Sequence, residues 1–125
     1  MTKIQQIVLM IYFIFGMSLN VLSQVLNKSS DDNLIKEKIY KNARNQMLRF
    51  NKKQFDSLFF DYFQKSSRPD IILSKNEFYN YTVRIGIYSE KLGLLYKDKK
   101  NQALKSKKEW LDKNYQDYLN SKKTK

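Results

Sequence analysis

Apolar side chains recur every three or four residues through most of the chain after its first quarter, which is the spacing of amphipathic helices. The pattern predicts a first helix over 32–50, a second over about 52–65, a third that begins after Ser74 and a fourth over about 99–120. The stretch 70–73 between the second and third helices is too short to build a sheet by itself. The sequence therefore predicts an all-α fold, a small bundle of three to four amphipathic helices.

Two sequence signatures mark where helices begin. Asn51 with Gln54, and Ser74 with Glu77, have the spacing of a capping box, in which each side chain bonds the backbone N–H of the other residue. A cap of this kind stabilises a helix by about 1 kcal/mol. We expect the second helix to start after Asn51 and the third after Ser74, with all four residues in a structural role.

The junction between the third and fourth helices is ambiguous. Tyr96, Ala103 and Trp110 repeat at intervals of seven, so one apolar stripe could run through both helices. The charged stretch 97–100 could instead interrupt them, and both alternatives stay open. We expect three aromatic residues of this region in the core rather than stacked on a nucleic acid: Tyr96, Trp110 and Tyr118.

Five further residues bear on helix packing. Gly86 and Gly93 either weaken the third helix or allow another helix to approach closely. Phe60, Tyr79 and Ile87 fall off the predicted apolar stripes. If the protein self-associates, these are the residues to examine for a contact between chains.

The N-terminus has the layout of an export signal. Lys3 precedes an apolar run of 11 residues from Ile7 to Met17, and the small residue Ser23 follows a more polar stretch. The run is shorter than the roughly 20 residues that cross a bilayer as a helix. The Ser23–Gln24 junction resembles the ends of bacterial signal peptides. We expect cleavage there and a secreted or periplasmic protein; the alternative is an uncleaved helix that anchors the chain in a membrane.

The sequence predicts four segments in chain order. These are a signal peptide over 1–23, a flexible N-terminus of the mature chain over 24–31, a single helical domain over 32–120 and a frayed basic tail over 121–125. The division follows the leader, the helical periodicity and the lysine-rich end, since no linker or low-complexity block separates the rest.

Composition excludes several kinds of site. The 125 residues contain neither His nor Cys, which removes zinc sites, thiol catalysis and histidine-based proton transfer. Three Gly and one Pro argue against a glycine-rich phosphate loop. The carboxylates do not pair on one helix face as general acid–base catalysis would require. We expect no enzymatic activity, no metal and no cofactor.

Positive charge is concentrated towards the C-terminus. The chain has 24 Lys and Arg against 12 Asp and Glu, and residues 97–125 contain ten Lys against four acidic residues. Such a surface attracts phosphate groups, anionic lipids and acidic proteins. A genome-wide bias towards A/T-rich codons explains the same lysine excess, and this alternative stays open. The candidate surface for an anionic partner comprises Lys97, Lys99, Lys100, Lys105, Lys107, Lys108 and Lys113.

The functional expectation is a small basic protein that acts without catalysis. Its partner would be an acidic protein, an anionic lipid or a cell-envelope polyanion. A structural subunit that covers its aromatic stripes by oligomerisation is the alternative, and an extracytoplasmic binder of nucleic acid or anionic lipid is a remote one. Specific nucleic-acid recognition is not expected, because bidentate contacts favour Arg and the chain has few.

Overall fold

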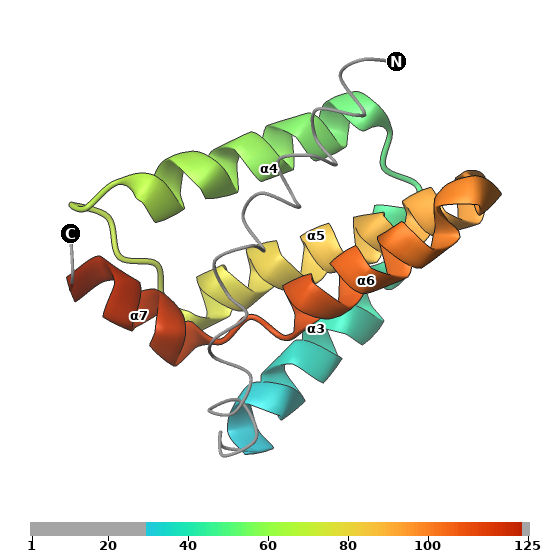
Figure 1. Cartoon of the computed structure of the whole chain (residues 1–125). Coiled ribbons are helices and arrows are strands. Elements are labelled where there is room, and N and C mark those ends of the chain that lie inside the picture. Colours follow the sequence, from blue (N-terminus) through green and yellow to red (C-terminus); the bar gives the residue numbers. More distant parts are fainter. Residues whose placement is uncertain (1–29, 124–125) are drawn as a thin grey trace.

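The computed structural model describes residues 30–123, and all regular structure in that range is helical (Figure 1). The predicted signal peptide 1–23 and the stretch 24–29 lie outside the described residues. The elements are α3 (Ser30–Leu48), α4 (Lys52–Ser67), α5 (Lys75–Leu95), the 3₁₀ turn η2 (Lys97–Lys99), α6 (Lys100–Leu111) and α7 (Tyr115–Lys123). The all-α prediction is confirmed, but the described chain has five α-helices rather than three or four.

Both predicted capping boxes are present. The side chain of Asn51 accepts a hydrogen bond from the Gln54 N–H at 2.8 Å, and the Gln54 side chain accepts one from the Asn51 N–H at 2.9 Å. Ser74 and Glu77 make the same reciprocal pair at the start of α5. Glu77 therefore serves the helix end, and the backbone hydrogen bond at Ser74 lowers the pKa of its carboxyl group.

Helix α5 is the centre of the fold. It contacts α3, α4, α6 and α7, and Figure 1 shows α4 and α3 on opposite sides of it with α6 running alongside. Aromatic rings fill the space between α4, α5 and α6. Phe55 stacks on Tyr88 with ring centroids 4.0 Å apart, and Trp110 meets Phe59 and Tyr62 edge-on at 5.9 and 5.6 Å. The core is thus built largely from ring contacts.

Small residues bring α5 and α6 close together as an antiparallel pair. A Cβ atom added at Gly93 would lie 3.1 Å from the Cβ of Ala103, and one at Gly86 would lie 3.2 Å from the Leu111 side chain. Between these contacts the hydroxyls of Ser89 and Ser106 are 3.2 Å apart. The two glycines therefore permit close approach, the second of the two roles that the sequence left open.

The predicted fourth helix over 99–120 is wrong as a single element. Helix α6 ends at Leu111, and α7 starts afresh at Tyr115. The reason is a cap that the sequence analysis did not assign: the side chain of Asn114 accepts hydrogen bonds from the N–H groups of Gln116 and Asp117 at 2.8 and 3.3 Å. At the other end of α6, Tyr96 and η2 separate it from α5, so the third and fourth helices are not continuous.

Helix α7 also corrects the predicted frayed tail. The helix continues to Lys123, and the side chain of Lys122 is buried. Its ammonium group donates to the carbonyl oxygens of Lys65 and Arg68 at the C-terminus of α4. Unpaired carbonyls at a helix end attract a cation. Of the predicted tail, 121–123 belongs to α7, and 124–125 lies outside the described residues.

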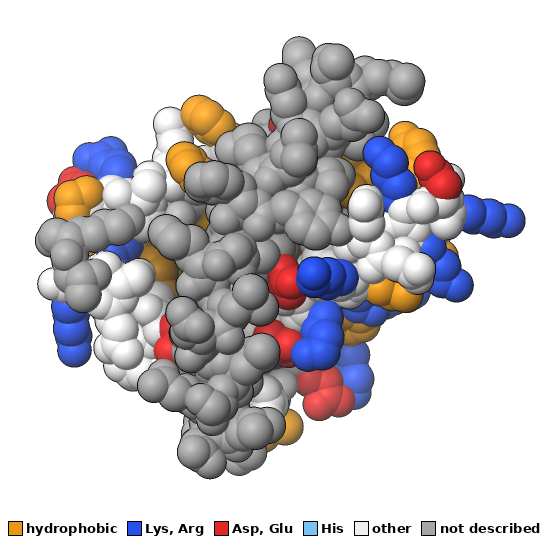
Figure 2. Space-filling model, viewed as in Figure 1, with side chains coloured by type: hydrophobic (Ala, Val, Ile, Leu, Met, Phe, Trp, Pro, Cys, Tyr) orange, Lys and Arg blue, Asp and Glu red, His pale blue; other side chains and the backbone are white. Residues whose placement is uncertain are grey.

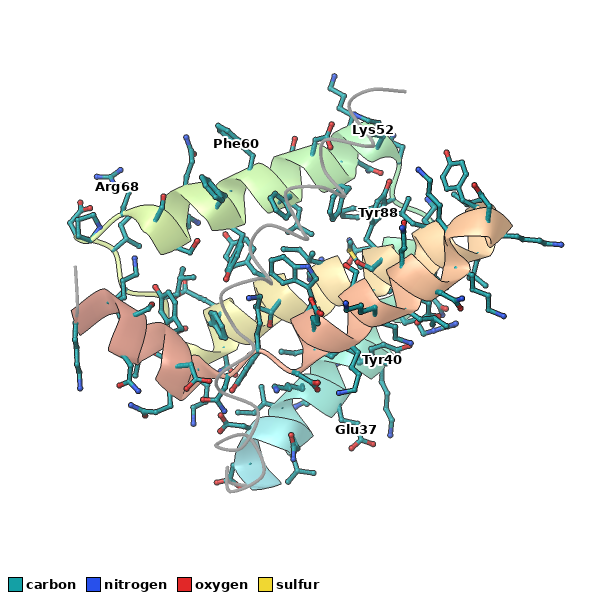
Figure 3. The ribbon with its side chains drawn as sticks, viewed as in Figure 1. Glu37, Tyr40, Lys52, Phe60, Arg68 and Tyr88 are labelled. Carbon is teal, nitrogen blue, oxygen red and sulfur yellow. The ribbon has the colours of Figure 1, made fainter. Side chains whose placement is uncertain are left out.

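Three of the burial expectations fail because of how the helices surround α5. Tyr79 and Ile87 are fully buried, since α5 is packed against neighbours on several sides and has little solvent face. Tyr96 is exposed because it lies beyond the end of α5. Phe60, by contrast, is exposed as its position off the apolar stripe indicates, and Figure 3 shows it projecting outward from α4.

Candidate functional site

The structure divides the seven candidate lysines into two groups. Lys97, Lys99, Lys100 and Lys105 lie where α5 ends, the chain turns through η2 and α6 begins. Among the described residues, no carboxylate lies within ion-pair distance of any of these four ammonium groups. Their charge is therefore not neutralised by a direct partner within that part of the chain.

The other three candidate lysines are engaged with the protein itself. Lys107 forms an ion pair with Glu90 at 2.8 Å, and Lys108 forms one with Asp112 at 2.7 Å. Lys113 lies 4.9 Å from the centroid of the Trp110 ring, and burial lowers its pKa to about 8. The Lys107 pair could not be read from the sequence, because it depends on α5 lying opposite α6, whereas Lys108 and Lys113 contact residues four and three positions away in the chain.

The α5–α6 turn also exposes apolar side chains. Leu94 and Leu95 are 64 % and 60 % exposed, and Tyr96 and Leu104 are 41 % and 47 % exposed. Figure 1 places this turn at the right-hand end of the molecule, beyond the α3–α4 connection, and Figure 2 shows several blue and orange side chains at that end, with a red one among them. We call this surface the tip; it comprises Leu94, Leu95, Tyr96, Lys97, Lys99, Lys100, Leu104 and Lys105.

Two helix ends meet at the tip and their partial charges offset each other, since α5 contributes a negative C-terminus and α6 a positive N-terminus. Lys99 occupies the N-cap position of α6 without making a side-chain cap, and the first turn of α6 holds no acidic residue. The N-terminus of a helix carries partial positive charge, so Lys99 and Lys100 stand at the unfavourable end. Asp98 is the one acidic side chain in 94–105, which leaves three net positive charges (four minus one).

The most saturated polar cluster surrounds Glu90 and joins three helices. Its carboxylate accepts hydrogen bonds from Tyr40 and Arg44 of α3, both at 2.6 Å, and pairs with Lys107 of α6. Tyr40 lies between α3 and α6 (Figure 3). Burial by itself would raise the pKa of Glu90, but these hydrogen bonds outweigh it and lower the pKa to about 2. With its oxygens occupied, Glu90 is suited to holding helices together rather than to proton transfer.

A second polar cluster fixes the opposite end of α3. The carboxylate of Asp32 accepts hydrogen bonds from the Tyr79 hydroxyl at 2.6 Å and from Lys75 at 2.9 Å. The same hydroxyl accepts the N–H of Tyr115 at 3.0 Å, which links α7 to the pair. This cluster connects α3, α5 and α7, and it accounts for the burial of a carboxylate in the first turn of a helix.

The remaining carboxylates do not converge. Asp56 pairs with Lys52 one turn earlier on α4, while Asp61 accepts from the Tyr81 hydroxyl and pairs with Lys65. Within 30–123, no three acidic side chains come together in a way that could hold a metal ion. Their arrangement is that of separate structural contacts.

Comparison with known proteins adds no relative. Neither the protein-family models, nor the curated proteins, nor the solved structures contain a match to this chain. Over the described part of the chain, none of the helices combines the length and apolarity needed to cross a membrane.

Proposed function

We propose that this protein is a small, non-catalytic binding protein that acts outside the cytoplasm and holds an acidic partner at the tip. The observation that carries the proposal is the group of four tip lysines that have no ion pair with another described residue, next to exposed leucines. Other lysines of the same candidate set are consumed by Glu90, Asp112 and the Trp110 ring. A partner that supplies negative charge would neutralise the positive charge of the tip lysines, which the described part of the fold does not pair.

The proposal is tested by comparing two variants that each lose three lysines, one at the tip and one elsewhere on the surface. The tip variant replaces Lys97, Lys99 and Lys100 by Gln. The matched control replaces Lys38, Lys41 and Lys123, which are exposed on α3 and α7. Both lower the net charge by three, and binding to immobilised poly-glutamate is measured for both by interferometry across salt concentrations.

We expect the tip variant to lose far more affinity than the control, and the native protein to lose binding on going to about 0.5 M salt, where charges are screened beyond a few ångströms. Equal losses in the two variants would mean that overall charge, and not the tip, determines binding. Binding that survives high salt would contradict an electrostatic mechanism.

The extracytoplasmic location has its own test. N-terminal sequencing of the native protein should find Gln24 as the first residue if the leader is cleaved after Ser23. Intact chains that begin at Met1 in the cytosolic fraction would contradict export. Intact chains in the membrane fraction would favour the anchored alternative.

Self-association is the second candidate function, and α4 supplies the observation that favours it. Phe60 and Phe63 are both exposed and lie one turn apart on α4, so they present rings on one face. A second chain that covers them would make the protein an assembly subunit. Light scattering over a range of concentrations tests this: a dimer that dissociates in the variant Phe60→Ser supports it, and a monomer at every concentration removes it.

A further inference from the structure

We infer that the partner of the tip is an anionic lipid bilayer, on which the exposed leucines enter the interface while the lysines contact headgroup phosphates. The inference rests on the proposed function and specifies its partner. It commits to a lipid surface rather than to an acidic protein, which becomes an outcome of the test below.

The shape and chemistry of the tip favour a bilayer. Leu94 and Leu95 are consecutive residues in the last turn of α5, and both are mostly exposed. The turn that follows lies at the end of the bundle and projects beyond the α3–α4 connection (Figure 1). A bilayer interface accepts apolar side chains from a protruding element without needing a matching groove.

The polar residues of the tip fit the same orientation. Lys97 and Lys100 flank the leucines with long side chains, which can lay their methylene stems against apolar material while the ammonium groups reach phosphates. Tyr96 adds a half-exposed ring with a polar hydroxyl, the kind of side chain that settles at the headgroup level. Apolar insertion and electrostatic attraction thus act at one place, and membrane attachment without a spanning helix needs such a pair of signals.

Charge distinguishes the tip from other exposed apolar positions. Phe60 lies one helical turn after Asp56 and directly before Asp61, and these carboxylates are paired with Lys52 and Lys65. The charge around this ring is therefore close to balanced and attracts an anionic surface less than the tip does. Ile72 follows Asp70 by two residues in the α4–α5 connection. At the tip, the exposed Leu94, Leu95 and Leu104 stand beside four lysines that have no ion pair with another described residue.

The tip is also firmly attached to the rest of the fold. Gly93 contacts Ala103 where α5 and α6 meet, and the Tyr96 N–H donates to the Leu92 carbonyl at 2.9 Å to close the last turn of α5. The leucines are therefore presented by a preformed element, which reduces the conformational entropy that binding would cost.

The first experiment uses the protein as it is isolated from the cells that make it. It measures how much of the protein sediments with vesicles of phosphatidylcholine alone or of phosphatidylcholine mixed with phosphatidylglycerol. We expect binding to the mixed vesicles, and about a 100-fold weaker partition when Lys97, Lys99 and Lys100 are replaced by Gln, since each lysine near an anionic surface contributes about fivefold. The matched control at Lys38, Lys41 and Lys123 should lose much less.

The second experiment removes the apolar contribution. Leu94→Ala with Leu95→Ala should weaken partition by about tenfold through loss of buried methylene area. The control pair Leu34→Ala with Ile72→Ala removes aliphatic side chains of similar exposure, away from the tip, and should leave partition unchanged. Equal effects of the two pairs would overturn the inference.

The third experiment shows where the bilayer touches the protein. Because the chain has no Cys, Leu94→Cys provides a unique site for an environment-sensitive dye, and Leu34→Cys provides the matched control. We expect the emission of the dye at position 94 to shift to the blue on mixed vesicles, with no shift at position 34. This readout separates insertion of the tip from any attraction by the N-terminal leader.

The outcomes separate this inference from the proposed function. No blue shift at position 94, together with tip-dependent binding to poly-glutamate, would overturn the lipid partner and leave an acidic protein as the ligand. Lysine variants of the tip that bind both vesicles and poly-glutamate like their controls would overturn both.

Discussion

The two ends of the helical bundle use the same residue types in opposite ways. At the α7 end, Tyr118 accepts the N–H of Leu73, Tyr115 donates to the Leu73 carbonyl, and Lys122 donates to the end of α4. At the tip, Tyr96 is exposed, and the neighbouring lysines lack an ion-pair partner among the described residues. Lysine and tyrosine are thus structural where a second element faces them, and available to a partner where none does.

The largest expected effect comes from removing a ring at the structural end. Tyr118→Ala deletes the side chain that stacks on Phe78 at 4.9 Å and bonds the Leu73 N–H. We expect a loss of about 3 kcal/mol in the free energy of unfolding, measured by urea denaturation. The matched change at the other end, Tyr96→Ala, should cost less than about 0.5 kcal/mol. Similar losses for the two would abolish the contrast between the ends.

The Glu90 cluster tests whether a lysine of the candidate set is structural. Glu90→Gln removes the charge that Arg44 and Lys107 share and should cost about 2 kcal/mol at pH 7. The folded pKa of about 2 lies below the ordinary 4.5, so this stabilisation is complete above pH 4.5 and is lost as the pH falls towards 2.

The measurement compares urea midpoints of the native protein and Glu90→Gln from pH 7 down to pH 2. The two curves should converge at the acid end. A difference that persists unchanged at pH 2 would mean that the carboxylate charge does not hold the three helices together.

A smaller effect is expected from the buried lysine of α7. Lys122→Met keeps the apolar stem but removes the ammonium group that donates to the Lys65 and Arg68 carbonyls, of which the Arg68 carbonyl keeps the Ile71 N–H as a donor. Stability should fall by about 1–2 kcal/mol, against no more than about 0.5 kcal/mol for Lys99→Met at the tip. Thermal unfolding followed by circular dichroism distinguishes the two, and equal shifts of the melting temperature would refute the assignment.

The smallest effect on stability is expected at the tip. Replacing Lys97, Lys99 and Lys100 by Gln should change the free energy of unfolding by no more than about 0.5 kcal/mol, because the unfavourable placement of Lys99 and Lys100 at the N-terminus of α6 is offset by the favourable placement of Lys97 just beyond the C-terminus of α5. Urea denaturation at low salt checks this. Marked destabilisation would show that these lysines serve the fold.

Much of the local structure could be predicted from neighbouring residues. The capping boxes at Asn51 and Ser74 depend on side chains three residues apart, and both occur as expected. Helical periodicity likewise predicted helices close to α3, α4 and α5. The start of α7 was missed, although Asn114 is itself a local signal, because the seven-residue repeat of Leu104, Leu111 and Tyr118 runs straight across the break.

The candidate site was located only in part. The sequence placed seven lysines together, and the structure groups four of them at the tip and turns Lys107, Lys108 and Lys113 to partners within the protein. Exposure of the leucines was not foreseen, because Leu95 and Leu104 continue the apolar stripes of their helices. A position on the apolar stripe of a helix is buried only where another helix packs against that part of the stripe, and no described helix does so at Leu95 and Leu104.

By itself the sequence determined that the chain is helical, where α4 and α5 begin and that no histidine or cysteine chemistry operates, because these depend on residue identity and on contacts within one or two turns. Tertiary structure alone decided that Glu90 neutralises Lys107, why Tyr79 and Ile87 are buried, and that α5 and α6 run past the other helices to form an exposed tip. These properties depend on which side chains distant in the chain come to lie opposite one another, and periodicity along one helix contains no information about its neighbours.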